Sequence, residues 1–498
     1  MSNLRTAAIT GALWSIGSRW GNRLLGFVNV AIVARILAPQ DFGLLAITML
    51  VVGFVEIWFS LGVESAVIQK QGDDRDIMDT AWTLRIIQGC LLGLILFLIA
   101  PLAATFMAEP RVAPLLRLIA VGITLSAFNN IGTVNWQKQL NFRRDFLVSL
   151  GAKLISVAVT ILLAWWLRNY WALAWGILSG YVLGFVISYL AEPYRPRWCL
   201  RRWRDLLSFS QWTLLNSIIG YASFKIDEIT VGRFLGSTSM GLYTMSSEVA
   251  LMPTAELSAP VNRVLFPAFS ALQSEPGRLA AACLNAVGMV TAITIPAGIG
   301  LALVAPEAVG LFLGAQWGEA APLVAILALH GILRALSGAA YPLLMAIGQP
   351  RAVACASLVS VVIFLAIAGA ALSVQAGILV LAWAKVVSTL AGGAMAWGFA
   401  LRYTQITLPA LLRTIWRPIA ASALMAAALL SAQPFIAGWV QSPVLTGLPI
   451  KVALGALVYT LASLALWQLS GRPNGFEQMA LARTRQIGAA LSARLRGH

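Results

Sequence analysis

The stretch Val33-Ala-Arg-Ile-Leu-Ala-Pro-Gln-Asp-Phe-Gly-Leu44 returns in outline 198 residues later, as Val231-Gly-Arg-Phe-Leu-Gly-Ser-Thr-Ser-Met-Gly-Leu242. Valine, arginine, leucine, glycine and leucine occupy matching positions at this single offset, and upstream Trp14 matches Trp212. The match has no gap over one long apolar run and the turn after it. This pattern predicts that the chain is an internal duplication.

The composition places both copies in a membrane. Of the 498 residues, 59% are hydrophobic and only 11% are charged, whereas soluble domains carry about 25% charged residues. A helix needs about 20 mostly apolar residues to cross the hydrocarbon core of a bilayer. We therefore expect an all-α polytopic membrane protein with about fourteen transmembrane helices. The predicted spans are 9–36, 41–64, 81–107, 113–134, 147–168, 171–191, 208–235, 240–268, 280–304, 321–347, 352–373, 376–402, 416–438 and 449–470.

The repeat and the spans together predict how the chain is organised. Six spans separate the two copies, so both run in the same direction, as a parallel repeat with its axis along the membrane normal. We expect an N-lobe over residues 1–204, a C-lobe over 205–403, and an extra helix pair with a basic tail over 404–498. Lysine and arginine cluster in alternate loops, such as the linker from Arg195 to Arg204, which predicts that both termini are cytoplasmic.

Several classes of function are disfavoured by the same composition. The net charge of +16 is spread over alternate short loops, as in membrane proteins, and does not indicate nucleic-acid binding. The four cysteines are isolated, so the sequence predicts neither a metal site nor a disulfide framework. The predicted external loops are short and hold no pair of residues suited to acid/base catalysis. We therefore expect that the protein is not an enzyme.

The repeated connection also carries a family resemblance. The segment Arg35-Ile-Leu-Ala-Pro-Gln-Asp-Phe-Gly43-Leu resembles the N-terminal signature of the polysaccharide-transporter family. Its echo, Asp227-Glu-Ile-Thr-Val-Gly-Arg-Phe-Leu-Gly236 followed by Met240-Gly-Leu-Tyr, resembles the corresponding second segment. With fourteen spans and duplicated lobes, the chain resembles Wzx-type oligosaccharide flippases of the MOP superfamily over nearly its whole length.

The resemblance implies a MOP flippase fold in the bacterial inner membrane. It implies translocation of undecaprenyl-pyrophosphate-linked oligosaccharide repeat units by alternating access, for synthesis of O-antigen, capsule or exopolysaccharide. Membrane lipids and proteins of polysaccharide polymerisation and export are the further partners that it implies. No bound cofactor is expected, although the family is often driven by a gradient of H+ or Na+.

Arginines inside an apolar run are the first candidate site. A charge at the bilayer centre costs roughly 2.5–3.5 kcal/mol on insertion scales, so such residues usually face a polar cavity. Arg19 and Arg23 are four residues apart and share one face of a helix. Because arginine binds phosphate oxygens bidentately, we predict that they hold the pyrophosphate head group, with Arg334 and Lys385 as further cavity residues. The alternative is that one or both arginines snorkel to the interface or pair with Glu56 or Glu64 of the second span. These two glutamates are also counted as secondary cavity residues.

Carboxylates in the second copy are the second candidate site. Asp227 and Glu228 lie within a predicted span and are candidates for ion coupling, because a carboxylate in a low-dielectric cavity favours its protonated form. The alternative is a structural salt bridge to Lys225. Glu248 and Glu256 are secondary cavity candidates, two helical turns apart.

A second transporter function is the main competing prediction. Cation-coupled multidrug exporters of the same superfamily handle organic cations, so they are expected to have an acidic cavity. The basic face formed by Arg19 and Arg23 favours the flippase over the exporter.

Overall fold

The structure is a computed structural model that describes residues 2–59, 75–138, 142–203, 211–439 and 446–472. The described residues form helices joined by short turns, and they contain no β-strand. The helices of the first half are α1 (Ser2–Val33), α2 (Pro39–Trp58), α4 (Arg75–Phe106), α5 (Val112–Ala127), the 3₁₀ turn η1 (Ile131–Thr133), α6 (Val134–Lys138), α7 (Phe142–Leu167), α8 (Trp171–Ala191) and α10 (Gln211–Phe234).

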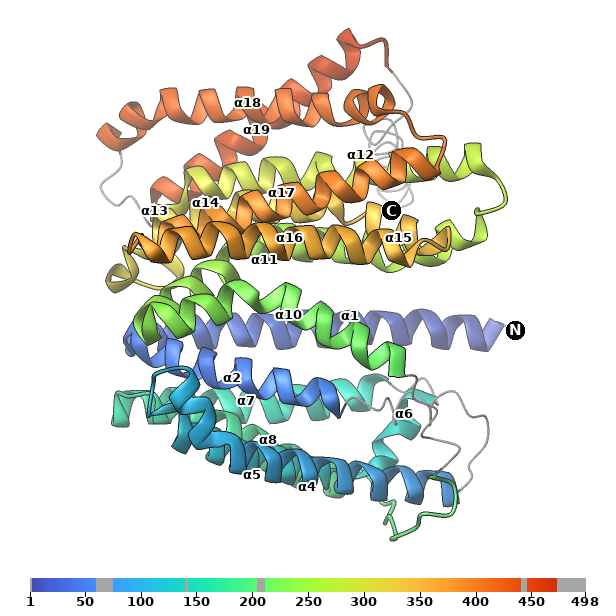
Figure 1. Cartoon of the computed structure of the whole chain (residues 1–498), viewed down its shortest axis with the longest axis vertical. Helices are drawn as coiled ribbons and strands as arrows, with labels where there is room; N and C mark the ends of the chain where they lie inside the picture. The colour runs from blue at the N-terminus through green and yellow to red at the C-terminus, as the bar shows by residue number, and fades with distance from the viewer. Residues whose placement is uncertain (1, 60–74, 139–141, 204–210, 440–445, 473–498) are drawn as a thin grey trace, which may run out of the picture. The chain divides into compact units, whose positions relative to one another are not determined.

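The second half continues in the same way (Figure 1). Its elements are α11 (Gly236–Ala271), α12 (Pro276–Leu303), α13 (Ala305–Phe312), η2 (Ala315–Trp317), α14 (Ala320–Ser337), α15 (Ala340–Ala346), α16 (Pro350–Ser373), α17 (Ile378–Tyr403), α18 (Leu408–Trp439) and α19 (Leu448–Leu469). Each of the fourteen predicted spans therefore overlaps a helix, and the span at 321–347 is divided between α14 and α15.

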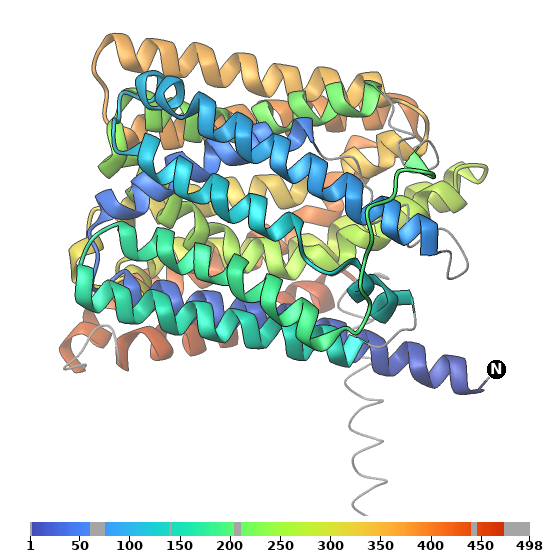
Figure 2. The same ribbon diagram turned by 90° about the horizontal axis from the view of Figure 1, so that it is seen from below.

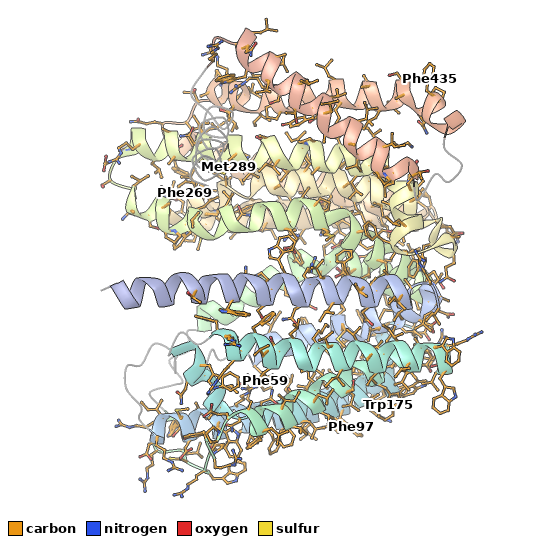
Figure 3. The ribbon with its side chains drawn as sticks, turned by 180° about the vertical axis from the view of Figure 1, so that it is seen from behind. Phe59, Phe97, Trp175, Phe269, Met289 and Phe435 are labelled. Atoms are coloured by element: carbon orange, nitrogen blue, oxygen red, sulfur yellow. The ribbon has the colours of Figure 1, made fainter. Side chains whose placement is uncertain are left out.

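Among the described helices, ten are long and apolar enough to cross a membrane by length and composition. The helix α5 is apolar but shorter. The helices α1, α10 and α11 carry most of the charged residues on which the site predictions rest. Apolar side chains cover the outside of the helices, as Figure 3 shows for Phe97, Trp175 and Phe435, all of which are exposed. Exposed rings along apolar helices are expected where lipid is the solvent.

By internal contacts the chain divides into two compact units. The first comprises Met1–Thr244 with Phe312–Gln316, and the second comprises Met245–Leu311 with Trp317–His498. This division lies one helix beyond the boundary predicted from the repeat at 204, because α10 packs on α2 of the first unit. The Tyr221 hydroxyl donates to the Leu50 carbonyl at 2.8 Å, and its ring lies against Gly53, which has no side chain to displace it. The predicted boundaries describe sequence repeats and stay a prediction.

Each unit has an apolar core built on close helix pairs. In the first unit, α1 lies beside α7, α4 beside α5, and α7 beside α8 (Figure 2). Leu96, Leu116 and Ile119 are fully buried where α4 and α5 meet. In the second unit, Phe269 and Leu343 are fully buried in a core that also includes residues of α12, α16, α17 and α18.

The repeated motif starts the helix α2 by local chemistry. Pro39 occupies the first helical turn, where its missing N–H has no helical partner to lose. Asp41, two residues on, accepts a hydrogen bond from the backbone N–H of Ala38 at 3.1 Å, one half of a capping box. The Pro-Gln-Asp part of the motif therefore ends the preceding turn and begins the next helix.

The motif glycines bring the two copies of the repeat into direct contact. A Cβ atom on Gly43 of α2 would lie 1.7 Å from the Ser237 carbonyl oxygen, and one on Gly241 of α11 would lie 1.8 Å from the Pro39 carbonyl oxygen. Positions 39 and 43 of the first copy correspond to 237 and 241 of the second, so the contact is reciprocal. Small residues allow helix backbones in a membrane to approach this closely. The repeat predicted from the sequence is thus present as a local two-fold relation at this crossing.

Candidate functional site

The predicted head-group arginines lie on α1, whose other side packs on α7. The Trp14 and Phe146 rings are 5.3 Å apart between centroids, and the hydroxyl oxygens of Ser18 and Ser149 are 3.4 Å apart. With 3.6 residues per turn, Arg19 and Arg23 project from the face opposite to this contact. Arg19 is exposed and Arg23 is half-buried. The structure therefore brings the two guanidinium groups to one face of α1 that is not used for packing against α7.

The predicted coupling residues lie on α10 and have distinct partners. The Lys225 ammonium is 2.5 Å from a Glu228 carboxylate oxygen, in an i, i+3 ion pair with both side chains mostly buried. Asp227 is buried and accepts a hydrogen bond from the Tyr243 hydroxyl of α11 at 2.8 Å. The salt bridge that was the alternative for Glu228 is thus present, and Asp227 has a hydrogen-bond partner on α11.

The two cavity candidates of the second unit lie on neighbouring parallel helices, α14 and α17. His330 Nδ1 of α14 and Thr389 Oγ1 of α17 are 3.0 Å apart, and further along the Trp397 indole N–H donates to the Leu336 carbonyl at 3.3 Å. Arg334 lies one turn beyond His330, whereas Lys385 lies one turn before Thr389. At a rise of 1.5 Å per residue, the two cations are therefore about 12 Å apart along the helix axes. Arg334 is exposed and Lys385 is half-buried.

The four secondary glutamates are scattered. Glu56 is exposed near the end of α2, and Glu64 lies outside the described residues. Glu248 is exposed and Glu256 is half-buried on α11. The described residues contain no group of three or more His, Cys, Asp or Glu side chains that could hold a metal ion.

Two ionic contacts were not predicted from the sequence. In the turn between α4 and α5, Glu109 accepts two hydrogen bonds from Arg111, at 2.8 and 3.0 Å, and one from the Ser237 hydroxyl at 3.0 Å. The hydrogen bonds from Arg111 lower the pKa of Glu109 below its usual value, against the opposing effect of burial. This cluster connects the α4–α5 turn to the start of α11, next to the crossing of Gly43 and Gly241.

The second contact lies in the second unit. Lys451 at the start of α19 pairs with Glu307 of α13, and both side chains are almost fully buried. The Glu109–Ser237 and Glu307–Lys451 contacts each join residues more than 100 positions apart in the chain. The Glu109–Arg111 pair is local. The only sequence signal was the rarity of charges in these turns, and rarity does not identify a partner.

Comparisons with known proteins agree with the sequence-based resemblance. A family model described as "Polysaccharide biosynthesis protein" matches residues 32–322. The lipopolysaccharide biosynthesis protein WzxC of Escherichia coli (strain K12) is 26% identical over 352 residues, covering 69% of this chain and 71% of that protein. The succinoglycan biosynthesis transport protein ExoT of Rhizobium meliloti (strain 1021) is 28% identical over 339 residues, covering 68% of each.

A solved structure supports the same fold. The lipid II flippase MurJ, in an inward closed conformation, superposes with a TM-score of 0.71 at 15% sequence identity. The match covers 92% of this chain and 99% of that one. Identity this low supports the fold of the helices and nothing about the molecule carried.

Proposed function

The chain belongs to the polysaccharide biosynthesis protein family, and from that premise we propose that it is a flippase for lipid-linked oligosaccharides. Its substrate would be an oligosaccharide repeat unit on undecaprenyl pyrophosphate, moved across the bacterial inner membrane for surface polysaccharide synthesis, with both termini cytoplasmic. Two relatives whose names refer to lipopolysaccharide biosynthesis and succinoglycan transport support this class of substrate.

The observation that carries the proposal is the basic face of α1. A pyrophosphate is the costliest part of such a substrate to move, because a charged group must leave water. Arg19 and Arg23 project together, about 6 Å apart along the axis, from the side of α1 opposite to α7. Two permanent cations can offset the charge of the head group with bidentate hydrogen bonds. The sugar would follow the basic face of α1 while the isoprenoid chain stays in lipid.

For coupling to an ion gradient, we propose the carboxylates Asp227 and Glu228 of α10. Glu228 is engaged by Lys225, so protonation of its carboxylate would break an ion pair. Asp227 is buried and accepts a hydrogen bond from an uncharged group, the Tyr243 hydroxyl. A proton on Asp227 would neutralise a charge in a low-dielectric site. The Asp227→Asn variant should therefore translocate substrate at a rate that no longer depends on the gradient.

Complementation tests the head-group site in cells. The host strain lacking this gene should recover surface polysaccharide with the unmodified chain and not with Arg19→Gln/Arg23→Gln. A matched control is Arg402→Gln/Arg413→Gln, which removes two exposed arginines from the second unit. Equal amounts of each protein in the membrane, checked by immunoblot, exclude a folding defect. Full recovery by the Arg19/Arg23 variant would contradict the proposed site, and export of a cationic dye in place of polysaccharide would favour the multidrug exporter.

A further inference from the structure

The segment over residues 192–203, which we call the strap, follows α8 and is fixed to the first turns of α4. The carboxylate of Asp79, itself buried, accepts from the Tyr194 hydroxyl at 2.6 Å and from the Arg197 backbone N–H at 3.0 Å. The Cys199 backbone N–H donates to the Thr83 hydroxyl at 3.0 Å. Burial and the bond to Asp79 raise the pKa of Tyr194, so this hydroxyl stays protonated and keeps donating. A segment without regular structure is thus held in one place by side chains of α4.

A second set of contacts fixes the beginning of the strap. The Asn130 amide donates to the carbonyl oxygens of Glu192 and Tyr194, at 3.2 and 2.7 Å. The Trp136 indole N–H donates to a Glu192 carboxylate oxygen at 2.6 Å. The bond from Trp136 engages the acidic side chain of Glu192 inside the unit, and the bonds from Asn130 hold the backbone of the strap. The carboxylates of Asp79 and Glu192 are therefore held inside the unit.

The outward side of the strap is basic and aromatic. Trp198 is 66% exposed although one edge of its ring contacts the Trp82 ring, with centroids 5.3 Å apart. An ion pair of Arg201 with Asp76, at 3.6 Å, is largely exposed and therefore weak. The exposed residues of the strap include four arginines and three large apolar side chains, namely Arg195, Arg197, Trp198, Leu200, Arg201, Arg202 and Trp203.

The strap lies directly beyond an apolar helix surface. Leu190, in the last turn of α8, is 80% exposed, and Val186 one turn earlier is also exposed. The guanidinium of Arg195 lies 5.7 Å from the centre of the Tyr189 ring in the same turn. Along the chain, the exposed arginines of the strap thus follow directly after an exposed apolar helix surface. This is the order in which a phospholipid presents its acyl chain and its phosphate.

We propose that the strap is a binding surface for the head group of an anionic phospholipid in the leaflet that this end of α8 reaches. The arginines would contact the phosphate and the anionic head group. The rings of Trp198 and Trp203 would lie at the membrane interface, as tryptophan does in membrane proteins, and the acyl chain would lie along Leu190. Because the strap is already ordered by α4, binding costs little conformational entropy. The proposal depends on the helices spanning a membrane and not on which substrate is carried.

The test compares lipids and variants on the full chain. Delipidated protein in a neutral detergent is titrated with phosphatidylglycerol or phosphatidylcholine, and bound lipid is counted by native mass spectrometry. The variant is Arg195→Gln/Arg197→Gln, and the control with the same loss of charge is Arg402→Gln/Arg413→Gln. Two arginines near an anionic surface are worth roughly thirtyfold in affinity at low salt. We expect the strap variant to lose about this much affinity for phosphatidylglycerol, and the control to keep it.

Two further measurements use the unmodified chain, so the proposal does not depend on the variant folding. The preference for phosphatidylglycerol over phosphatidylcholine should fall steeply as sodium chloride is raised from about 50 to about 500 mM, because screening weakens exposed charges. Competition with inorganic pyrophosphate separates a lipid site from a site for soluble phosphate. Displacement by pyrophosphate beyond that by salt of equal ionic strength would overturn the lipid assignment, as would equal losses in the strap and control variants.

Discussion

Adding one methyl group at the crossing of the two repeats should destabilise the protein. A Cβ on Gly43 would lie 1.7 Å from the Ser237 carbonyl oxygen, where real contacts are not closer than 3.0 Å, so α2 and α11 must separate by at least 1.3 Å. Forcing extra volume into a packed contact typically costs about 1–3 kcal/mol. We expect Gly43→Ala to lower the thermal midpoint, Tm, of the purified protein by several degrees.

The reciprocal geometry makes the prediction sharper than a single substitution. Gly241→Ala should cost a similar amount, because its Cβ would lie 1.8 Å from the Pro39 carbonyl oxygen. Once one methyl group has separated the helices, the second has less to displace, so the double variant should cost less than the sum. The control is Gly184→Ala on α8, where a Cβ meets nothing within 4 Å and alanine should stabilise the helix by roughly 0.5–1 kcal/mol.

The assay is a Tm measurement on the unmodified chain and all four variants in the same detergent. We predict a lower Tm for each single variant at the crossing, a double variant that is less damaged than additivity requires, and an unchanged or higher Tm for the control. Equal Tm values for Gly43→Ala and Gly184→Ala would refute the close approach of the two backbones.

Three further predictions concern buried and paired polar groups. Lys451→Ala should lower the free energy of unfolding by about 3–5 kcal/mol, because it leaves the Glu307 carboxylate buried without its cation. A Lys451→Met/Glu307→Gln double variant should recover most of the lost Tm. No recovery would argue against a stabilising Lys451–Glu307 pair. The pKa of Glu109 is lowered in the folded protein, so its contribution to stability is present above the unfolded pKa and is lost as pH falls through the folded pKa. Below about pH 4.5, Tm should therefore fall more steeply in the unmodified chain than in Glu109→Gln. Parallel curves of Tm against pH would exclude this contribution. Tyr243→Phe removes the hydroxyl that donates to buried Asp227 and should cost roughly 1–3 kcal/mol, measured by Tm, whereas an unchanged Tm would mean that the bond contributes nothing.

Hydropathy located the helices well because lipid demands long apolar runs, but it placed their ends less well. The helix α4 begins at Arg75, before the predicted 81, and α18 begins at Leu408, before the predicted 416. Polar and amphipathic residues continue a helix into the interface without raising hydropathy. By contrast α5 ends at Ala127, before the predicted 134, because the chain turns at Asn130, whose side chain accepts from the Gly132 N–H at 2.9 Å.

The candidate site was predictable only in part. The spacing of Arg19 and Arg23 was enough to place both on one face of a helix, since helical geometry is local. Partners in other helices were not predictable in the same way. Tyr243 approaches Asp227 from α11, and Asp79 orders a segment more than 100 residues away that the sequence suggested only as a linker. Such contacts depend on tertiary packing, which periodicity does not encode.

The most direct test of the central claim is translocation in proteoliposomes. A fluorescent undecaprenyl-pyrophosphate oligosaccharide is reconstituted with the unmodified chain, with Arg19→Gln/Arg23→Gln, or with the Arg402→Gln/Arg413→Gln control, with and without a proton or sodium gradient. For the unmodified chain, we predict movement of the lipid-linked sugar that the gradient stimulates. In the Arg19/Arg23 variant alone, the rate should fall by roughly tenfold or more, equivalent to the loss of one bidentate phosphate contact. The same rate in all three proteins would contradict the head-group site, and no movement by the unmodified chain would contradict the flippase itself.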